Sequence, residues 1–278
     1  MNMAESIETK RNFQLWKCVL YLMLTVTGCN PGEGGFRPDR QVEAIYEEAV
    51  IIEDGDTLST QPRVLAERWN WDGRELKSID YYNGSALEVS EVMRYEDRRI
   101  VSAGLSGGFT EVYHYGGDKL DSITVYDAGG RWVESVCFQH SKVRVKRVSW
   151  NSPAGVKTYK LSWQGENPGS LLPEDGAEDT IEFSYDNREN PVLGLMTWWR
   201  LRDVQGLAEA VSRNNCIKIR GGGLQADYSY EYDGDYPVSR TVVREYDYTE
   251  YVWDPVARCN RERVRHRYEK QVRTIAYL

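Results

Sequence analysis

An aromatic residue followed five positions later by an aliphatic residue recurs along the chain, with a polar, turn-forming stretch between the two. The first such segment runs from Trp71 to Leu76, and the second runs from Tyr95 to Ile100. The aromatic positions are separated by 24, 20 and 23 residues, and they are Trp71, Tyr95, Tyr115 and Phe138. Later candidates for the same position are Trp163, Tyr185 and Tyr232. A nearly fixed interval of this kind indicates a repeated supersecondary unit.

Each unit has the pattern of a β-hairpin. Apolar and polar residues alternate on both arms, and Asp-Gly, Gly-Gly or Asp-Asn stands at the bend, where positive φ is needed. One hairpin is marginally stable alone, and stacking against its neighbours buries a shared apolar face. The sequence therefore predicts an all-β fold: a curved, largely antiparallel sheet of repeated hairpins, with at most one or two short helices.

Local patterns add detail to this prediction. Short helical turns are expected at residues 42–49 and 207–211, and residues 138–143 are interpreted as a fourth, degenerate copy of the repeat. The polar residues 165–180 are expected to form a loop. Residues 221–223 are three glycines without the Lys-Ser/Thr of a phosphate-binding loop, so we expect a turn between strands there.

The first 29 residues divide into the zones of an export signal. A basic leader precedes an apolar run at residues 18–27, which is too short for the roughly 20 residues that span a bilayer. Residues 26–29 (VTGC) resemble the lipobox of bacterial lipoproteins. That resemblance implies that Cys29 is acylated and becomes the new N-terminus, and several acyl chains hold a protein stably at a membrane. The alternatives are an unprocessed buried helix and secretion without a lipid.

The predicted organisation follows from this signal. Residues 1–28 are a lipoprotein signal peptide, residues 29–40 are the lipid anchor and a flexible tether, and residues 41–278 are a single antiparallel β-repeat domain. The predicted location is the cell envelope, at the outer membrane. Three cysteines remain beyond the anchor and no CxxC spacing occurs, so at most one disulfide can form and buried single thiols are favoured. These cysteines are Cys137, Cys216 and Cys259.

Two further segments carry a family resemblance. Residues 185–191 (YDNRENP), an aromatic-rich stretch, and residues 212–215 (SRNN) resemble uncharacterised Bacteroidetes lipoproteins that combine a lipobox with repeated aromatic-turn-aliphatic hairpins. The hairpins are also distantly similar to the Tyr-Asp repeats of RHS-type proteins, whose strands spiral into a shell. The resemblance covers roughly residues 60–250. Tyr95-Glu96 and Tyr115-Gly116 depart from the Tyr-Asp pattern, so a closed RHS-like shell is not expected. The family implies no catalytic residue.

Charge and residue usage exclude several classes of function. The formal net charge is −8, and it becomes −9 without residues 1–28, with 32 basic and 41 acidic residues. A nucleic-acid partner is therefore not expected, because phosphate binding needs a basic surface. His114, His140 and His266 are widely spaced and form no zinc-binding pair. No cofactor and no metal are predicted.

Acidic pairs give the enzyme interpretation that remains open. A glycosidase needs two carboxyl groups about 5 to 10 Å apart. The candidate pairs are Asp54/Asp56, Asp233/Asp235 and Glu174/Asp175. Each pair stands beside Gly or Pro, where Asp side chains commonly bond to nearby backbone, so turn formation is favoured over catalysis. Calcium binding at the Asp-Gly-Asp pairs is not favoured either, because calcium takes six to eight oxygen ligands and two carboxylates supply fewer.

Aromatic residues are abundant, with 19 tyrosines and 9 tryptophans but only 5 phenylalanines. Some of them could form a stacking platform for sugar rings, and the candidates are Trp198, Trp199, Tyr228, Tyr230 and Tyr232. The alternative is that they pack in the core of the repeats. If the two adjacent tryptophans lie in a strand, their rings point to opposite faces and one of them is exposed.

The sequence predicts a non-catalytic cell-envelope lipoprotein with a binding or structural role, whose partner is a glycan or another envelope protein. One alternative is a glycan-acting hydrolase that uses a carboxylate pair. Another is a carrier of an acyl ligand in the concavity of the sheet. A hydrolase requires two carboxylates that converge in a cleft, a glycan binder requires exposed aromatic rings, and an acyl carrier requires an apolar cavity.

Overall fold

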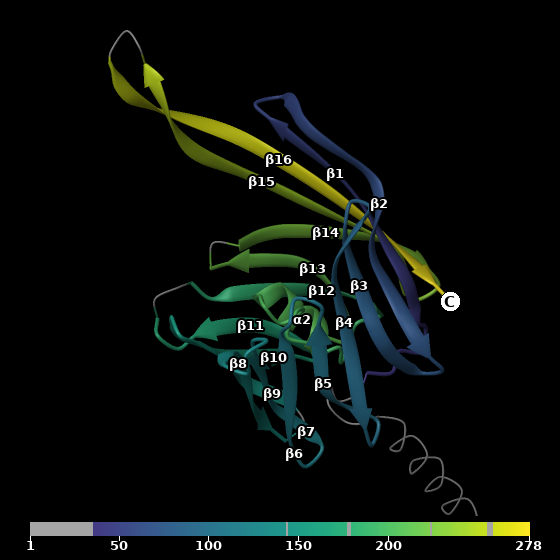
Figure 1. Cartoon of the computed structure of the whole chain (residues 1–278). Helices are drawn as coiled ribbons and strands as arrows, with labels where there is room; N and C mark the ends of the chain where they lie inside the picture. The colour runs from purple at the N-terminus through teal and green to yellow at the C-terminus, as the bar shows by residue number, and fades with distance from the viewer. Residues whose placement is uncertain (1–35, 143, 177–178, 223, 255–257) are drawn as a thin grey trace, which may run out of the picture. The chain divides into compact units, whose positions relative to one another are not determined.

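The computed structural model describes residues 36–142, 144–176, 179–222, 224–254 and 258–278. These residues form sixteen antiparallel strands and one helix (Figure 1). The described helix is not long and apolar enough to cross a membrane. The strands are β1 (Val42–Glu53), β2 (Asp56–Asp72), β3 (Glu75–Asn83), β4 (Ala86–Glu96), β5 (Arg99–Leu105), β6 (Thr110–Gly116), β7 (Lys119–Tyr126), β8 (Trp132–Ser141), β9 (Arg144–Ser152), β10 (Gly155–Gln164), β11 (Asn167–Pro173), β12 (Ile181–Glu189), β13 (Asn214–Gly221), β14 (Leu224–Asp233), β15 (Tyr236–Asp254) and β16 (Cys259–Tyr277). The helix is α2 (Val204–Val211).

The sheet closes into a barrel in which each strand pairs with its neighbours in sequence and β1 pairs with β16. The all-β, antiparallel prediction is confirmed, and the curved sheet goes further than predicted because it closes on itself as a barrel. Closure depends on β1, whose Ile45 lies opposite Ile275 of β16 on one side and Glu67 of β2 on the other. An open sheet would leave two edges of unpaired backbone groups, and closure removes both edges.

The helical turn predicted at residues 42–49 was wrong, because these residues belong to β1. Val42, Ile45 and Ala49 are three or four positions apart, which imitates the period of a helix. The strand conformation is imposed instead by partners that lie far along the chain, in β2 and β16. Local periodicity does not show such partners.

The repeat has a structural meaning that links adjacent hairpins. A β-bulge in the ladder immediately precedes the aromatic residue. Its polar tip then bonds to the backbone carbonyl of the aliphatic residue in the preceding hairpin. The hydroxyl of Tyr95 donates to Leu76 at 3.0 Å, and the hydroxyl of Tyr115 donates to Ile100 at 2.9 Å. The aromatic-turn-aliphatic pattern is therefore the joint between successive hairpins.

The fourth copy of the repeat lies two residues beyond the predicted position. The ladder bulge falls between Gln139 and His140, and the His140 ring nitrogen Nε2 lies 2.8 Å from the carbonyl oxygen of Leu120. The matching aliphatic residue is Val145, whose carbonyl accepts a bond from the Trp163 indole at 2.8 Å. Phe138 points into the core instead. The sequence pattern did not show this copy, because a histidine occupies the position that Tyr95 and Tyr115 occupy in their repeats.

Two other local predictions have mixed outcomes. The helix expected at residues 207–211 is confirmed as α2, which begins slightly earlier, at Val204. The stretch 165–180 is not wholly a loop, because residues 167–173 form β11 and pair with β10. The hairpin bends have the expected conformation: Gly73 has φ +58°, and Asp97 and Arg98 both have positive φ in a two-residue turn.

The inside of the barrel is filled. Residues 190–213, which connect β12 to β13 and include α2, lie within the ring of strands (Figure 1). Leu195 and Leu201 in this segment are 0% exposed, and they belong to one core cluster with the inward-facing apolar side chains of the strands. We call residues 190–213 the plug segment. Barrels of this strand number can enclose an aqueous channel, but here the chain itself occupies the interior.

The outer wall of the barrel is polar. Most outward positions of β2–β10 carry hydroxyl, amide or charged side chains that bond across neighbouring strands, such as Asn70 to Ser78 at 2.9 Å and Ser149 to Thr158 at 2.9 Å. Barrels that cross a membrane carry an apolar band on this outward face. Exposed apolar side chains on β2–β10, such as Val92 and Val156, lie among these polar ones, so this part of the wall is suited to contact with water.

The strands β15 and β16 continue beyond the rim as a two-stranded ribbon (Figure 1). They pair from Ser239 and Thr274 to Asp254 and Cys259, whereas the partner strands β14 and β1 stop earlier. The inward faces of these long strands therefore extend past the plug segment and line the mouth of the barrel.

Removal of one repeat hydroxyl tests the joint between hairpins. Tyr95→Phe leaves the Leu76 carbonyl without its partner, and we expect the free energy of unfolding to fall by about 1–2 kcal/mol. Urea unfolding measures this change. Tyr126→Phe is the matched control, because the described residues give its hydroxyl no hydrogen bond, and it should change stability by less than about 0.5 kcal/mol. Equal stability of the two variants would contradict this role.

Candidate functional site

The plug segment is fastened at both ends by asparagines. The Asn190 amide donates to the carbonyls of Glu209 at 2.6 Å and Ser212 at 2.9 Å, so the two ends of the segment are tied together. Asn215 donates to the carbonyl of Glu189 at 3.1 Å, immediately before the segment begins. These asparagines lie in the two motifs that carry the family resemblance. The two motifs therefore hold the two ends of the plug segment together.

The helix α2 forms the later part of the plug segment. Asp203 caps its N-terminus, where the carboxylate accepts a bond from the Gly206 backbone at 2.7 Å. One face of the helix is buried in the barrel by Leu207, Ala208, Ala210 and Val211. The cap and this apolar face fix α2 against the wall.

Three buried glutamates from alternate strands hold the middle of the plug segment. Glu67 of β2 accepts from Arg200 at 2.7 Å. Glu91 of β4 lies 3.4 Å from the Thr197 hydroxyl, and Glu111 of β6 accepts from the Trp198 backbone at 3.0 Å. An irregular buried segment needs such acceptors, because its backbone and side-chain donors have lost water.

The sequence contains a signal for these glutamates that the pattern analysis missed. Each one stands four residues before the aromatic position of its repeat, so the carboxyl groups recur at the same interval as the aromatic residues. Residues four apart in a strand point to the same face. The positions are Glu67, Glu91 and Glu111, whereas the equivalent position before His140 holds Val136.

Glu91 and Glu111 interact directly, and the Oε1 atom of each is buried without another hydrogen-bond partner in the described part of the molecule. We infer that the two groups share one proton, because two carboxyl groups can bond to each other only if one of them is protonated. Their other oxygens accept from tyrosines, Glu91 from Tyr81 at 3.0 Å and Glu111 from Tyr113 at 2.6 Å. Burial raises the pKa of both groups, and the neighbouring Glu91 carboxylate holds the pKa of Glu111 well above its usual range.

Glu67 occupies the same position in its repeat, but its pKa is shifted in the opposite direction. Burial by itself would raise the pKa of Glu67, but the charges of Arg200 and Arg273 outweigh burial and lower it. Arg200 lies 2.7 Å from the Glu67 carboxylate and Arg273 lies 3.3 Å from it. A second pair, Arg240 with Glu209 at 2.7 Å, continues this network across the barrel.

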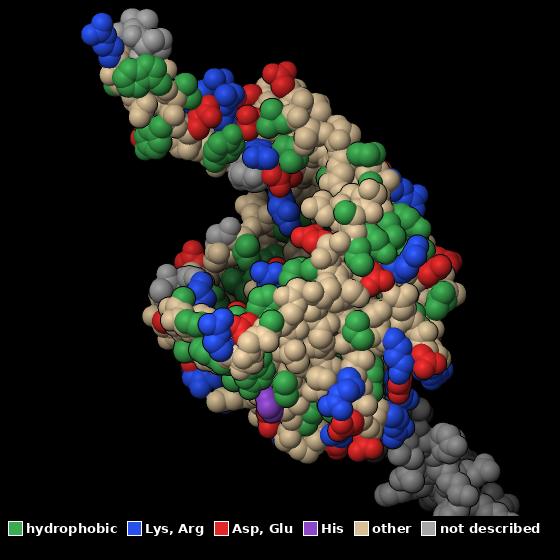
Figure 2. Space-filling model, viewed as in Figure 1, with side chains coloured by type: hydrophobic (Ala, Val, Ile, Leu, Met, Phe, Trp, Pro, Cys, Tyr) green, Lys and Arg blue, Asp and Glu red, His purple; other side chains and the backbone are tan. Residues whose placement is uncertain are grey.

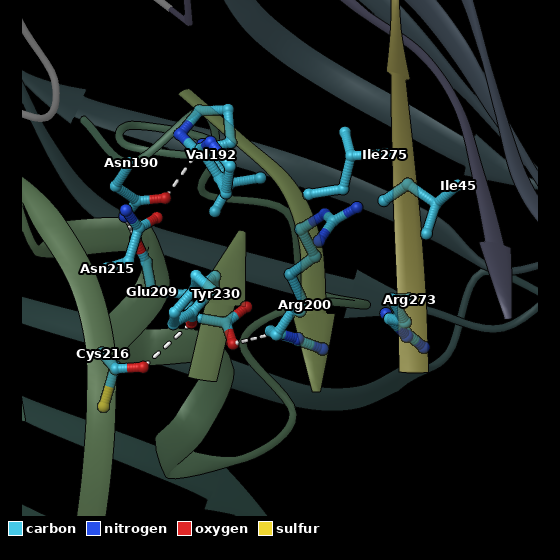
Figure 3. A pocket seen from close by; sticks show the side chains of 13 residues that line it. Ile45, Asn190, Val192, Arg200, Glu209, Asn215, Cys216, Tyr230, Arg273 and Ile275 are labelled. Atoms are coloured by element: carbon cyan, nitrogen blue, oxygen red, sulfur yellow. Dashed lines mark hydrogen bonds and ion pairs between the residues drawn. The ribbon is translucent and has the colours of Figure 1, made fainter. Parts of the chain in front are cut away.

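A small cavity of about 50 Å³ lies inside the barrel on one side of the network. Figure 3 shows Asn190, Asn215 and Cys216 on one side of it and Arg273 and strand residues from the two chain ends, Ile45 and Ile275, on the other. This volume holds a few waters at most.

A larger cavity of about 350 Å³ opens on the other side of the network, at the mouth of the barrel. We call it the mouth cavity. Figure 2 shows the surface hollowed beneath the β15–β16 ribbon, with basic side chains in the hollow. The plug segment, β2, β3, β15 and β16 supply the polar and aromatic lining, which includes Tyr81, Trp199, Asp203, Arg244 and Gln271.

Two of these polar side chains have no partner in the described part of the molecule. Arg244 of β15 and Gln271 of β16 make no hydrogen bond or ion pair with described residues, although both line the mouth cavity. The centroid of the Trp199 ring lies 5.8 Å from that of the Tyr81 ring and 4.7 Å from the guanidinium carbon of Arg202. The mouth cavity therefore presents free hydrogen-bonding groups beside an aromatic ring.

A wider hollow of about 760 Å³ adjoins the mouth cavity and shares Asp203 with it. The hairpin between β9 and β10 and the plug residue Arg202 line it. The Trp150 indole, on its wall, donates to the Leu201 carbonyl at 2.7 Å, so this ring holds the plug segment in place.

The residues expected to form an aromatic platform are not brought to one surface. Trp198 is buried, whereas the adjacent Trp199 is half-buried and lines the mouth cavity; both lie in the plug segment, not in a strand. The tyrosine row of β14 uses its hydroxyls internally, with Tyr228 on Gln205, Tyr230 on the Cys216 carbonyl and Tyr232 on Asp186. Cys29 lies outside the described residues.

The acidic pairs named in the sequence analysis lie at turns or in ion pairs. Asp54 has φ +50° at the β1–β2 turn and accepts a bond from the Arg265 guanidinium at 2.7 Å. Glu174 is paired with Arg147 and with Lys160. In the described ranges, no group of three or more His, Cys, Asp or Glu residues is arranged to hold a metal ion. Cys137, Cys216 and Cys259 are free thiols, and only Cys216 is buried.

No protein-family model matches the chain, and no curated protein matches it. Among solved structures, a porin-like protein from Bacteroides uniformis ATCC 8492 is similar with a TM-score of 0.49 and 11% identity, over 85% of this chain and 98% of that chain. A porin-like protein from Bacteroides vulgatus ATCC 8482 has a TM-score of 0.26 and 12% identity, over 86% and 99% of the two chains. At these values neither likeness carries an argument about function.

The shared proton makes stability depend on pH. The folded pair keeps a proton that the unfolded chain loses above the ordinary glutamate pKa of about 4.3. The contribution of the pair is therefore fully present below that pKa and declines as pH rises towards the raised pKa, by up to about 1.4 kcal/mol per pH unit. Glu111→Gln supplies a permanent amide donor, so we expect its stability relative to the wild type to increase with pH.

Urea unfolding of both proteins over a pH series measures this difference. Glu88→Gln is the control, because Glu88 is exposed on β4, the strand that carries Glu91, and its replacement should leave the wild-type pH dependence intact. Parallel stability curves for Glu111→Gln and the wild type would show that no proton is shared.

Proposed function

We propose that this chain is a lipid-anchored cell-envelope protein that binds a small polar ligand in the mouth cavity of its filled barrel. The observation that carries the proposal is the mouth cavity itself, with a volume of about 350 Å³ and free polar groups on a rigid floor. Small-molecule sites are preformed hollows of about 300–1,000 Å³ in which a few placed polar groups fix the ligand.

The floor of the mouth cavity is rigid because the plug segment is bonded to the wall at several points. Arg200 lies on the floor and is held by Glu67, and Arg240 on the wall is held by Glu209. A site whose lining is fixed before binding loses little conformational entropy when the ligand enters. This arrangement favours a ligand-binding role for the plug segment over a role limited to filling the barrel.

A hydrolase is less well supported. Among the described residues, Glu91 and Glu111 are carboxyl groups that converge, and neither lines the inner cavity, the mouth cavity or the adjoining hollow. Three acids reach the mouth cavity. Glu67 and Glu209 are each neutralised by an arginine, and Asp203 caps the N-terminus of α2 through one carboxylate oxygen. A general acid needs access to its substrate, and a proton-sharing pair sealed in the core lacks it.

An acyl carrier is also less well supported. The concavity imagined for an open sheet is filled by the plug segment, and the apolar interior of the barrel is occupied by its own leucines. The remaining mouth cavity is lined mostly by charged and amide side chains. An acyl chain would leave these groups without partners, which costs free energy for each one.

The envelope location rests on the signal and on the polarity of the barrel. The lipobox-like residues 26–29 provide a lipid at Cys29 as the membrane contact, as in the Bacteroidetes lipoproteins that the chain resembles. The barrel wall is polar outside, which suits a domain held beside the membrane in water.

The anchor is tested by Cys29→Ser in the native host. The variant should lose radiolabelled palmitate and move from the membrane fraction to the soluble fraction, because no acyl chain holds it. Cys259→Ser, at an exposed free thiol of the barrel, should remain lipidated and membrane-bound. Unchanged membrane retention of Cys29→Ser together with no palmitate label on the wild type would refute the anchor.

Ligand binding is tested on the full chain in detergent micelles with a panel of neutral and acidic oligosaccharides. Saccharides that raise the melting temperature should bind Trp199→Ala at least tenfold more weakly by calorimetry, since the ring lines the mouth cavity. Trp132→Ala removes an exposed tryptophan that does not line this cavity and should bind as the wild type does. A panel without any binder would count against the proposal.

A further inference from the structure

We infer that the ligand of the mouth cavity is an acidic saccharide, a sugar ring that bears one carboxylate, and that Arg244 binds this carboxylate. The inference rests on the proposed function and names its ligand class. It is carried by the distribution of charge over the lining of the cavity.

The other arginines that line the mouth cavity are already neutralised. Arg200 pairs with Glu67 at 2.7 Å, and Arg240 pairs with Glu209 at 2.7 Å. Arg273 is divided between Glu47 at 2.9 Å and Glu67 at 3.3 Å. These pairs hold the floor and wall of the barrel together and leave no guanidinium free for a ligand.

Arg244 is the exception among the described lining residues. The residue opposite it on β16 is Glu269, which pairs with Arg267 at 3.1 Å and not with Arg244. Arg244 points to the same side of β15 as Arg240, since the two are four residues apart in a strand. One guanidinium without a counter-ion in the described part of the molecule therefore faces a partly enclosed cavity, and a guanidinium binds a carboxylate or a phosphate group bidentately.

A single free guanidinium selects a ligand with one negative charge. A phosphate monoester carries a charge of up to about −2 near neutral pH and would need further cations. The remaining free groups are uncharged or acidic: the Gln271 amide, the Trp199 indole N–H and the Asp203 carboxylate. The Asp203 Oδ1 accepts the Gly206 backbone bond, which leaves its second oxygen for a hydroxyl donor.

The mixture of these groups indicates a sugar ring as the body of the ligand. A pyranose has apolar faces and a rim of hydroxyls that both donate and accept hydrogen bonds. The Trp199 ring offers an apolar surface. Beside it, the Gln271 amide can donate and accept hydrogen bonds, and the Asp203 carboxylate can accept them. The volume of about 350 Å³ suits a short saccharide and is too small for a long chain.

The inference is tested by calorimetry on the full chain in micelles with a diglucuronic acid and the neutral diglucose of the same linkage. The acidic disaccharide should bind at least tenfold more tightly than the neutral one, and added salt should reduce that ratio. Arg244→Gln should weaken the acidic disaccharide at least tenfold and leave the neutral one unchanged. Arg244→Lys should recover part of the loss.

Arg68→Gln is the matched control, because Arg68 is exposed on the outer wall and should change neither affinity. The melting temperature of each variant without ligand verifies that it is folded. Equal binding of both disaccharides, unaffected by Arg244→Gln, would overturn the acidic class and leave the proposed function standing. Arg244-dependent binding of a dipeptide without binding of either sugar would overturn the saccharide class, and binding of none of these probes would count against the proposed function itself.

Discussion

The fold depends on hydrogen bonds between buried glutamates of the wall and an irregular segment of chain inside the barrel. A sixteen-strand barrel is wide enough for a channel, so this one needs an insertion to build a core, and the inserted backbone brings donors that have lost water. Glu111 accepts from the Trp198 backbone, and Glu67 accepts from Arg200. Burying carboxylates is costly unless their charge is removed or compensated. The barrel uses both solutions: a shared proton at Glu91 and Glu111, and two arginines at Glu67.

Much of the local structure could be predicted from the sequence, because hairpins depend on residues close together in the chain. The spacing of Tyr95 and Ile100 indicated a turn between two strands, and the structure adds that Tyr95 is the joint to the preceding hairpin. The closure could not be predicted in this way. It depends on Ile45 meeting Ile275, two residues separated by most of the chain, and nothing in the local pattern of β1 distinguishes a strand from an amphipathic turn.

The candidate site was predicted only in part, for a related reason. The pair of adjacent tryptophans predicted a ligand-binding role for Trp199, and this residue does line the mouth cavity. Arg244 and Gln271 lie instead in long strands rich in charged residues, where alternation alone suggests a solvated surface. They face a cavity because β15 and β16 extend past the end of the plug segment, so their inward side is neither packed nor fully exposed. The depth to which the plug segment fills the barrel decides this, and that depth is set by contacts of Arg200 and Thr197 with distant strands.

The same ion pairs that complete the core also shape the cavity above it. Arg200, Glu209, Arg240 and Arg273 line both the inner cavity and the mouth cavity, so they form the partition between the two. Arg273 lies on β16 and pairs with Glu47 of β1, across the seam that closes the barrel. A ligand in the mouth cavity would therefore contact residues whose ion pairs hold the closed barrel together. Arg244 and Gln271 lie further out than these ion pairs and take no part in closing the barrel. Their side chains therefore remain without partners in the described part of the molecule.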